Sequence, residues 1–218
     1  MATKDFAHLH VHTEYSMLDG AARLGDLFSY AKELGMSSMA TSDHGFLFGA
    51  FDFWRQAKAH DIKPIIGVEA YLTPGTHRTD RSRVRWGDGS RDDVSGGGAY
   101  THMTMWAETT EGMHNLFRAS SIASLEGQLY KPRMDREVLQ TYSKGLIATT
   151  GCPSGEIQTR LRLGQFDEAL QAASDFRDIF GKDNFYCEVM DHGLDIERNV
   201  QEDLHRLAKQ LNLPYVAT

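Results

Sequence analysis

The stretch HLHVHTEYSMLDG, residues 8–20, places imidazoles at alternate positions of a short β-rich run. In an extended strand, residues two apart share one face and lie about 7 Å apart, so His10 and His12 can both reach one metal cluster. Asp19 follows in the next loop, from which its carboxylate can turn back onto the same site. A pair of hydrogen-bonded core histidines explains His10 and His12 equally well, while His8, deeper in the run, is expected to be structural.

The bulk composition is that of one globular domain, which we expect over residues 1–218. No run is apolar enough to cross a bilayer and the start carries no secretory signal, so we expect a cytoplasmic protein. Cys152 and Cys187 lack the spacing of a disulfide framework. The net charge of −7 disfavours a free-standing nucleic-acid binder, because such binding depends on lysine and arginine neutralising phosphates. Any nucleic acid therefore has to be delivered by another part of the protein.

Short β-rich runs alternate with amphipathic helical runs, a pattern typical of βα units. The expected strands are residues 7–13, 38–43, 63–72, 100–108, 145–151, 184–190 and 213–218. The expected helices are residues 22–35, 48–60, 111–125, 135–141, 154–180 and 195–211. Seven such units predict an α/β fold, either a distorted (β/α)7 barrel related to the TIM barrel or a doubly wound open sheet. Residues 74–99, rich in Gly, Arg and Asp, are expected to form a long flexible loop, and contact of its arginines and Trp86 with single-stranded DNA stays open.

Further metal-ligand side chains recur along the later strands. His44 follows the second expected strand, Glu69 lies within the third, His102 begins the fourth and Cys152 follows the fifth. A carboxylate inside the apolar run IIGVEAYL costs several kcal/mol unless a cation or hydrogen bonds compensate it. Because working residues of barrel enzymes gather at the C-terminal ends of the strands, we expect these side chains to converge.

The complete set of candidate ligands is too large for one tetrahedral zinc and too mixed for calcium or magnesium. Its members are His10, His12, Asp19, His44, Glu69, His102 and Cys152. The set implies two or three clustered divalent metals, zinc or manganese, although Cys152 can also be an inert thiol. Clustered metals favour hydrolysis of a phosphoester, because they stabilise the charge that develops on phosphoryl oxygens.

Five segments carry a family resemblance: HLHVHTEYSMLDGAARL, SDHGFLFGAFDFWRQAKAHDIKPIIGVEAYL, YTHMTMWAE, YKPRMDREVL and GLIATTGCPSGEI. Together they resemble the PHP (polymerase and histidinol phosphatase) family, in particular the PHP domains of bacterial C-family replicative DNA polymerases. The resemblance implies a distorted seven-stranded barrel and a trinuclear site with nine ligands. Seven of these are the residues above, and the last two are an Asp-x-His pair expected beyond Thr218, ahead of the rest of the polymerase.

The resemblance also implies roles for individual residues. Asp19, His12 and Glu69 are expected to act in catalysis. His192, Lys131 and Arg133 are candidates for contact with substrate or with another domain.

The implied function is a metal-dependent 3′→5′ exonuclease that proofreads within a DNA-directed DNA polymerase during replication. The nucleotidyl transfer itself would belong to other domains. The expected partners are the DNA primer terminus, the remaining polymerase domains that deliver it, and other replisome components, without a membrane. Two alternatives stay open: a noncatalytic module whose metals brace the polymerase, and a free-standing PHP phosphoesterase that acts on a small phosphomonoester.

Overall fold

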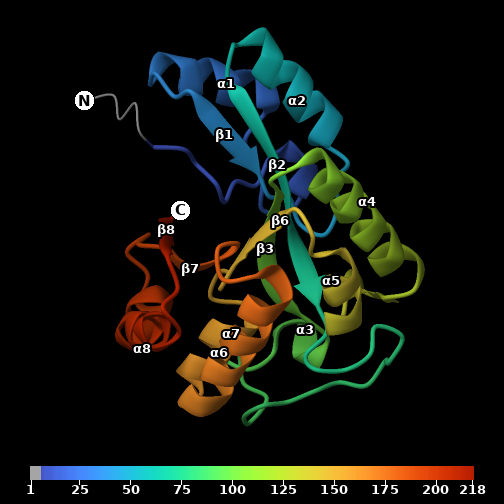
Figure 1. The fold of residues 1–218 in the computed structure, drawn as a ribbon, viewed down its shortest axis with the longest axis vertical. Helices are drawn as coiled ribbons and strands as arrows, with labels where there is room; N and C mark the ends of the chain where they lie inside the picture. The colour runs from blue at the N-terminus through green and yellow to red at the C-terminus, as the bar shows by residue number, and fades with distance from the viewer. Residues whose placement is uncertain (1–5) are drawn as a thin grey trace.

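The computed structural model describes residues 6–218, which form one mixed sheet with helices packed around it (Figure 1). Its strands are β1 (Ser38–Thr41), β2 (Lys63–Leu72), β3 (Thr101–Ala107), β4 (Gln128–Leu129), β5 (Lys131–Met134), β6 (Leu146–Thr149), β7 (Phe185–Val189) and β8 (Tyr215–Ala217). Its α-helices are α1 (Leu24–Glu33), α2 (Ala50–Ala59), α3 (Ser95–Gly98), α4 (Thr110–Leu125), α5 (Arg136–Tyr142), α6 (Glu156–Arg162), α7 (Phe166–Phe180) and α8 (Asp195–Leu211). A 3-10 turn, η1 (Glu14–Ser16), precedes them.

The sheet has the strand order β4-β5-β2-β3-β6-β7-β8, and β1 pairs with the first half of β2. It curls into part of a barrel, so the expected α/β fold of the distorted barrel type is confirmed. The alternating pattern of βα units also predicts a parallel sheet, and this expectation is wrong for β3, which runs antiparallel to both β2 and β6. The reason lies between β2 and β3: parallel pairing needs a crossover, usually helical, and residues 73–100 supply only the four-residue α3.

The first expected strand, residues 7–13, is not a regular strand in the structure. The segment nevertheless runs beside β1, because Ala40 N donates to the carbonyl of His8 (2.8 Å) and Ser42 N donates to that of Val11 (2.9 Å). This irregular segment still directs alternate side chains to one side.

Most of the other elements lie close to their expected positions, and β2 and α8 have the expected bounds. The expected helix over residues 154–180 is two helices instead, because Gly164 adopts a left-handed conformation (φ 73°) between α6 and α7. The hairpin of β4 and β5 was missed from the sequence because its strands are short and contain Pro132.

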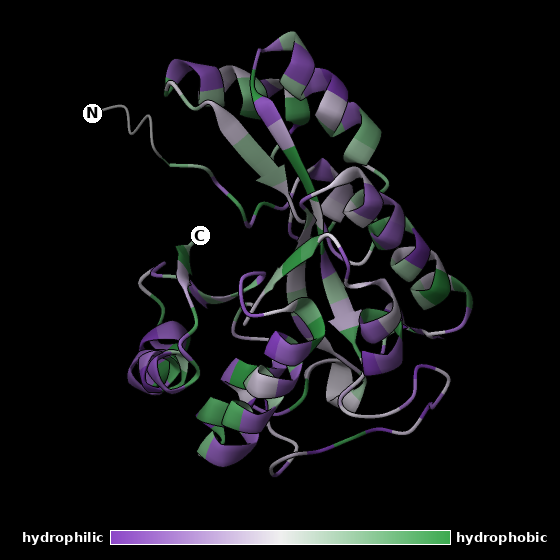
Figure 2. Cartoon of the chain, viewed as in Figure 1, coloured by the Kyte–Doolittle hydropathy of each residue, from purple (hydrophilic) through white to green (hydrophobic). Residues whose placement is uncertain are grey.

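Two clusters of buried apolar side chains support the fold. The larger joins the sheet to α4–α8, and the smaller joins α1 and α2 to β1 through pairs such as Phe28 and Phe53, whose ring centroids lie 4.8 Å apart. Figure 2 shows the matching pattern, with purple residues on the outward sides of the helices. Among the helices of residues 6–218, none combines the length and apolar character that crossing a membrane requires.

The segment over residues 74–99 is held to the domain at several points. The Asp93 carboxylate accepts hydrogen bonds from the backbone amides of Trp86, Gly87 and Gly89. Trp86 also lies beneath Arg160, whose guanidinium carbon is 4.0 Å from the ring centroid. The loop thus contacts α6 through Trp86 and Arg160, and its expected flexibility stays a prediction.

Candidate metal centre

All seven candidate ligands line one cavity of about 350 Å³. They arrive from separate parts of the chain: the segment beside β1, the loops after η1 and β1, the strands β2 and β3, and the loop after β6. Cys152 and Asp19, which are far apart in the sequence, thereby face the same space. The cavity is also lined by Ser154, Met190, His192, Glu197 and Thr218.

Glu69 is the centre of the cluster. Its Oε1 lies 3.5 Å from His10 Nε2 and 3.1 Å from His102 Nδ1, and it accepts a hydrogen bond from the thiol of Cys152 at 3.0 Å. Its other oxygen, Oε2, lies 3.5 Å from His12 Nε2 and 2.7 Å from His44 Nδ1. Each oxygen thus faces its own set of nitrogen or sulfur atoms, so each could serve as a metal ligand beside them.

Two buried atoms at this point have no hydrogen-bond partner: His44 Nδ1 and Glu69 Oε2. They lie 2.7 Å apart but are not aligned for a hydrogen bond. Unsatisfied buried polar atoms are costly and demand an explanation. Donor atoms of His10, His12 and Glu69, and of His44, Glu69 and His102, lie within 4.8 Å of one another. The residues present therefore fit divalent cations bound on both sides of Glu69.

The electrostatics of the cluster also favour cations. Burial raises the pKa of Glu69, but the imidazoles of His10, His102 and His44 hold that pKa well below its usual value. Burial lowers the pKa of His10, but the carboxylates of Glu188 and Glu69 outweigh it and raise the value to about 10. Burial also raises the pKa of the Cys152 thiol, as does nearby Glu69. The Glu69 carboxylate is thus charged and attracts positive charge, which the protonated His10 supplies when metal does not.

Asp19 and His44 form a second part of the centre. His44 Nε2 lies 2.7 Å from Asp19 Oδ2, and the Asp19 side chain is 55% exposed. The loop that carries Asp19 is anchored by buried Asp43, which accepts hydrogen bonds from the hydroxyls of Thr13 and Ser16. This anchoring on the N-terminal side of Asp19 supports an exposed carboxylate at the edge of the cavity.

The loop that carries Asp19 passes close to the backbone of Thr13 at Gly20, where there is no room for a Cβ. A Cβ at Gly20 would lie 1.9 Å from the carbonyl oxygen of Thr13, so Gly20→Ala must displace the neighbouring Asp19. We expect this variant to bind metal about tenfold more weakly, the lower range for disturbing a ligand's support. Gly25→Ala is the matched control, because a Cβ there meets nothing within 4 Å and favours α1. Equal metal affinity of the two variants by calorimetric titration would contradict the prediction.

The sequence analysis missed Glu188, a fully buried carboxylate on β7. It lies 2.7 Å from His10 Nδ1, accepts a hydrogen bond from Thr218 Oγ1 at 2.8 Å, and accepts another from Thr149. Because Nδ1 of His10 is directed to Glu188, its Nε2 is directed to Glu69 and the cavity. The signal was available: Glu188 interrupts the apolar run FYCEVM just as Glu69 interrupts its own strand.

The remaining candidates lie in three different environments. His192 lines the rim of the cavity, with Nδ1 2.7 Å from Glu197 Oε1. Lys131 lies outside this cavity, with its ammonium 5.3 Å from the ring centroid of Tyr71. Arg133 is 1% exposed and its guanidinium donates to backbone carbonyls, among them those of Gly127 and Ala99. The expectation of substrate or interdomain contact is therefore wrong for Arg133, because its donors are already engaged inside the domain.

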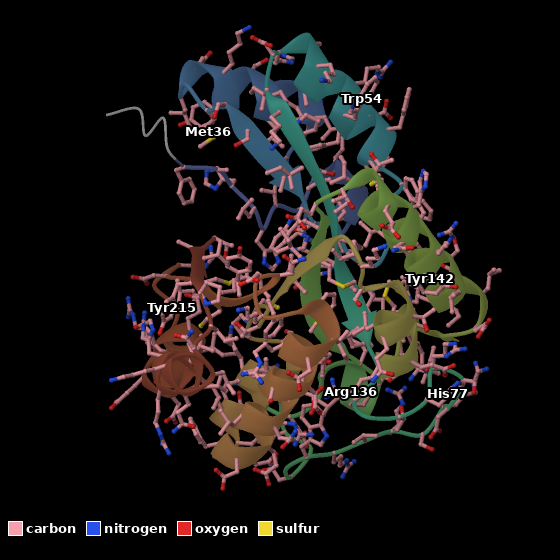
Figure 3. All side chains as sticks on the ribbon, viewed as in Figure 1. Met36, Trp54, His77, Arg136, Tyr142 and Tyr215 are labelled. Carbon is pink, nitrogen blue, oxygen red and sulfur yellow. The ribbon has the colours of Figure 1, made fainter. Side chains whose placement is uncertain are left out.

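A third group of donors, His77, Asp135 and Glu137, lies elsewhere. Figure 3 shows His77 on the loop after β2, at the margin of the molecule. Arg78 forms ion pairs with Asp135 and Glu137 at 3.1 Å each, so these carboxylates already have a cation.

The structure thus combines a curled α/β sheet with a cavity lined by histidine, carboxylate and thiol side chains, the residue types that bind divalent metal ions. The chain belongs to the PHP domain family, whose profile matches residues 8–192. It is 59% identical over 227 aligned residues to the DNA polymerase III subunit alpha of Saccharopolyspora erythraea, and the alignment covers 100% of this chain and 19% of that relative. It is 54% identical to the corresponding subunit of Mycobacterium leprae, again over 100% of this chain and 19% of the relative. The chain thus spans about a fifth of the length of these polymerase subunits.

Two solved structures are similar at greater distance. One is named as a metal-dependent phosphoesterase of Bifidobacterium adolescentis, with 12% identity, a TM-score of 0.44, and coverage of 97% of this chain and 85% of that one. The other is an amidohydrolase of Chromobacterium violaceum, with 13% identity, a TM-score of 0.45, and coverage of 97% and 87%.

Proposed function

We propose that the metal centre hydrolyses phosphodiester bonds at the 3′ end of DNA, as the proofreading exonuclease of a replicative DNA polymerase of the polymerase III alpha type. The observation that carries the proposal is the position of Glu69, which is buried, charged and faced by four imidazoles and a thiol on its two oxygens. Such a site has no role in an ordinary core. It is the ligand arrangement for clustered zinc or manganese ions, which suit mixed imidazole, carboxylate and thiolate donors.

Divalent cations held there would supply Lewis acidity for a phosphodiester and for the attacking water. His10, His12, His44, His102, Cys152 and Glu69 would hold the ions. Asp19, the exposed carboxylate of the cluster, accepts the proton of the attacking water. The bond between phosphorus and the 3′ oxygen breaks, which releases a nucleoside 5′-monophosphate and leaves a 3′ hydroxyl after proton uptake.

The partners follow from this reaction. The primer terminus reaches the cavity from the polymerase domains that the relatives carry beyond the matched fifth of their length. Delivery is needed because the net charge of −7 gives this chain little attraction for DNA by itself. His192 at the rim of the metal cavity and Lys131 outside it would contact the incoming strand, and other replisome components would bind the polymerase as a whole.

The test is release of nucleotides from a primer with a mispaired 3′ end by the full-length protein. We expect Asp19→Asn and His12→Ala to lower the rate about 100-fold or more, because each removes a group that acts in the reaction, and a chelator to abolish it. His77→Ala is the control, because His77 also lies within 3.7 Å of two carboxylates but outside the cavity.

Retained nuclease activity in Asp19→Asn and His12→Ala would overturn the proposal. A different result would indicate a structural role. In that case the wild type would show no nuclease activity, and the variants would lose only the rise in melting temperature that metal produces, so the metals would stabilise the polymerase without catalysis.

A further inference from the structure

A second cavity of about 470 Å³ adjoins the metal centre and has a different character. The two cavities share Asp19, His44 and His102, so they lie on either side of these side chains. The second is lined mainly by apolar and aromatic side chains, among them Tyr15, Met17, Leu18, Phe46, Phe48 and Tyr71. Nothing in the hydrolytic step uses these groups.

The aromatic lining of this cavity includes one stacked pair that reaches solvent. The rings of Phe46 and Phe48 are stacked, with centroids 4.5 Å apart and planes at 11°. Phe48 is 72% exposed, and Met17 and Leu18 beside it are almost fully exposed. Contiguous exposed apolar side chains of this kind mark a binding surface. Lys131 also lines this cavity and places a cation there.

Resting on the proposed exonuclease function, we propose that this aromatic cavity binds the unpaired base of the nucleotide that is removed. A base is joined to its phosphate by a single ribose, so a phosphodiester at Asp19 and His44 leaves the base in the adjoining cavity. Stacking on aromatic side chains accepts every base, because each has a π-face, and it requires that the base has left its partner strand. The cavity thus selects a frayed or mispaired end over a paired one.

A protein segment is a poorer occupant than a base. Because the two cavities share Asp19, His44 and His102, an occupant of the second lies next to the metal centre, where a protein segment has no phosphodiester to offer. A substrate base that enters with its own phosphate uses both cavities at once.

The kinetic test uses the full-length protein and two single-stranded DNAs, one ending in a normal nucleotide and one in an abasic nucleotide. We expect the wild type to cleave the normal end about tenfold faster in kcat/KM, the scale of one stacked base. Phe48→Ala should lose this preference and Phe48→Trp should keep it. Phe51→Ala is the matched control, because Phe51 is 69% exposed and stacked on Trp54 but lies outside the cavity.

A binding measurement separates this inference from the nuclease itself. DNA with 2-aminopurine at the 3′ end and a cleavage-resistant phosphorothioate linkage should lose fluorescence on binding to the wild type and Phe51→Ala, with about tenfold weaker binding to Phe48→Ala. Equal cleavage of normal and abasic ends by the wild type would overturn the base subsite and leave the nuclease standing. Phe48-dependent quenching without any cleavage would support the subsite and remove the proposed function. Equal quenching by all variants, without cleavage by the wild type, would contradict both the base subsite and the proposed nuclease function.

Discussion

Glu69→Gln is expected to abolish most metal binding, with an affinity at least about 100-fold weaker than that of the wild type. Glutamine has almost the same shape as glutamate, but it lacks the negative charge of the carboxylate. Its amide nitrogen also cannot bind a cation, so one of the two ligand atoms is lost. At a metal concentration 100 times the wild-type Kd, one site stabilises the fold by about 2.7 kcal/mol, and the variant should gain almost none of this. Melting temperature with and without metal, together with metal content, measures the effect.

Glu156→Gln is the control for the loss of a buried carboxylate. Glu156 is also buried and forms ion pairs at 3.2 Å with Arg136, labelled in Figure 3, and at 3.1 Å with Arg160, but it does not line the metal cavity. We expect this variant to melt at a lower temperature and to keep the full gain on metal addition. A normal gain in Glu69→Gln would show that Glu69 holds no metal.

Glu188→Ala is expected to weaken metal binding by about 100-fold, and Glu188→Gln by about tenfold. Glu188 holds Nδ1 of His10 at 2.7 Å and so directs Nε2 toward Glu69. Glutamine can still accept from Nδ1, which preserves the orientation of the ring, whereas alanine releases it. Calorimetric titration with metal measures the affinity of each protein, which should decrease from the wild type to Glu188→Gln to Glu188→Ala.

The control for this pair is Glu197→Ala. Glu197 also lies 2.7 Å from an imidazole Nδ1, that of His192, at the rim of the same cavity. Because His192 is no candidate ligand, we expect unchanged metal affinity in Glu197→Ala. An equal loss of metal affinity in Glu188→Ala and Glu197→Ala would mean that removing any carboxylate near the cavity weakens metal binding. That result would contradict the orienting role of Glu188.

Local patterns in the sequence were enough to predict much of the scaffold. The strand at Lys63–Leu72 and the helix at Asp195–Leu211 have their expected bounds, since continuous apolar runs and helical periodicity are properties of neighbouring residues. The candidate ligands could be found in the same way, because a charged or imidazole side chain at the end of a β-rich run conflicts with its surroundings. Such a residue can be recognised from its immediate sequence neighbours, without knowledge of the fold.

What the sequence by itself determined is therefore the class of elements and the chemistry of the donors. Only the tertiary structure decided the antiparallel course of β3, the burial of Arg133 among backbone carbonyls, and the pairing of His10 with Glu188, which are 178 residues apart. The aromatic cavity likewise draws on loops and strands from Tyr15 to Lys131. These features depend on which segments contact one another in the folded chain. Such contacts are stabilised by packing between residues that are far apart in the sequence, and local conformational propensity does not determine them.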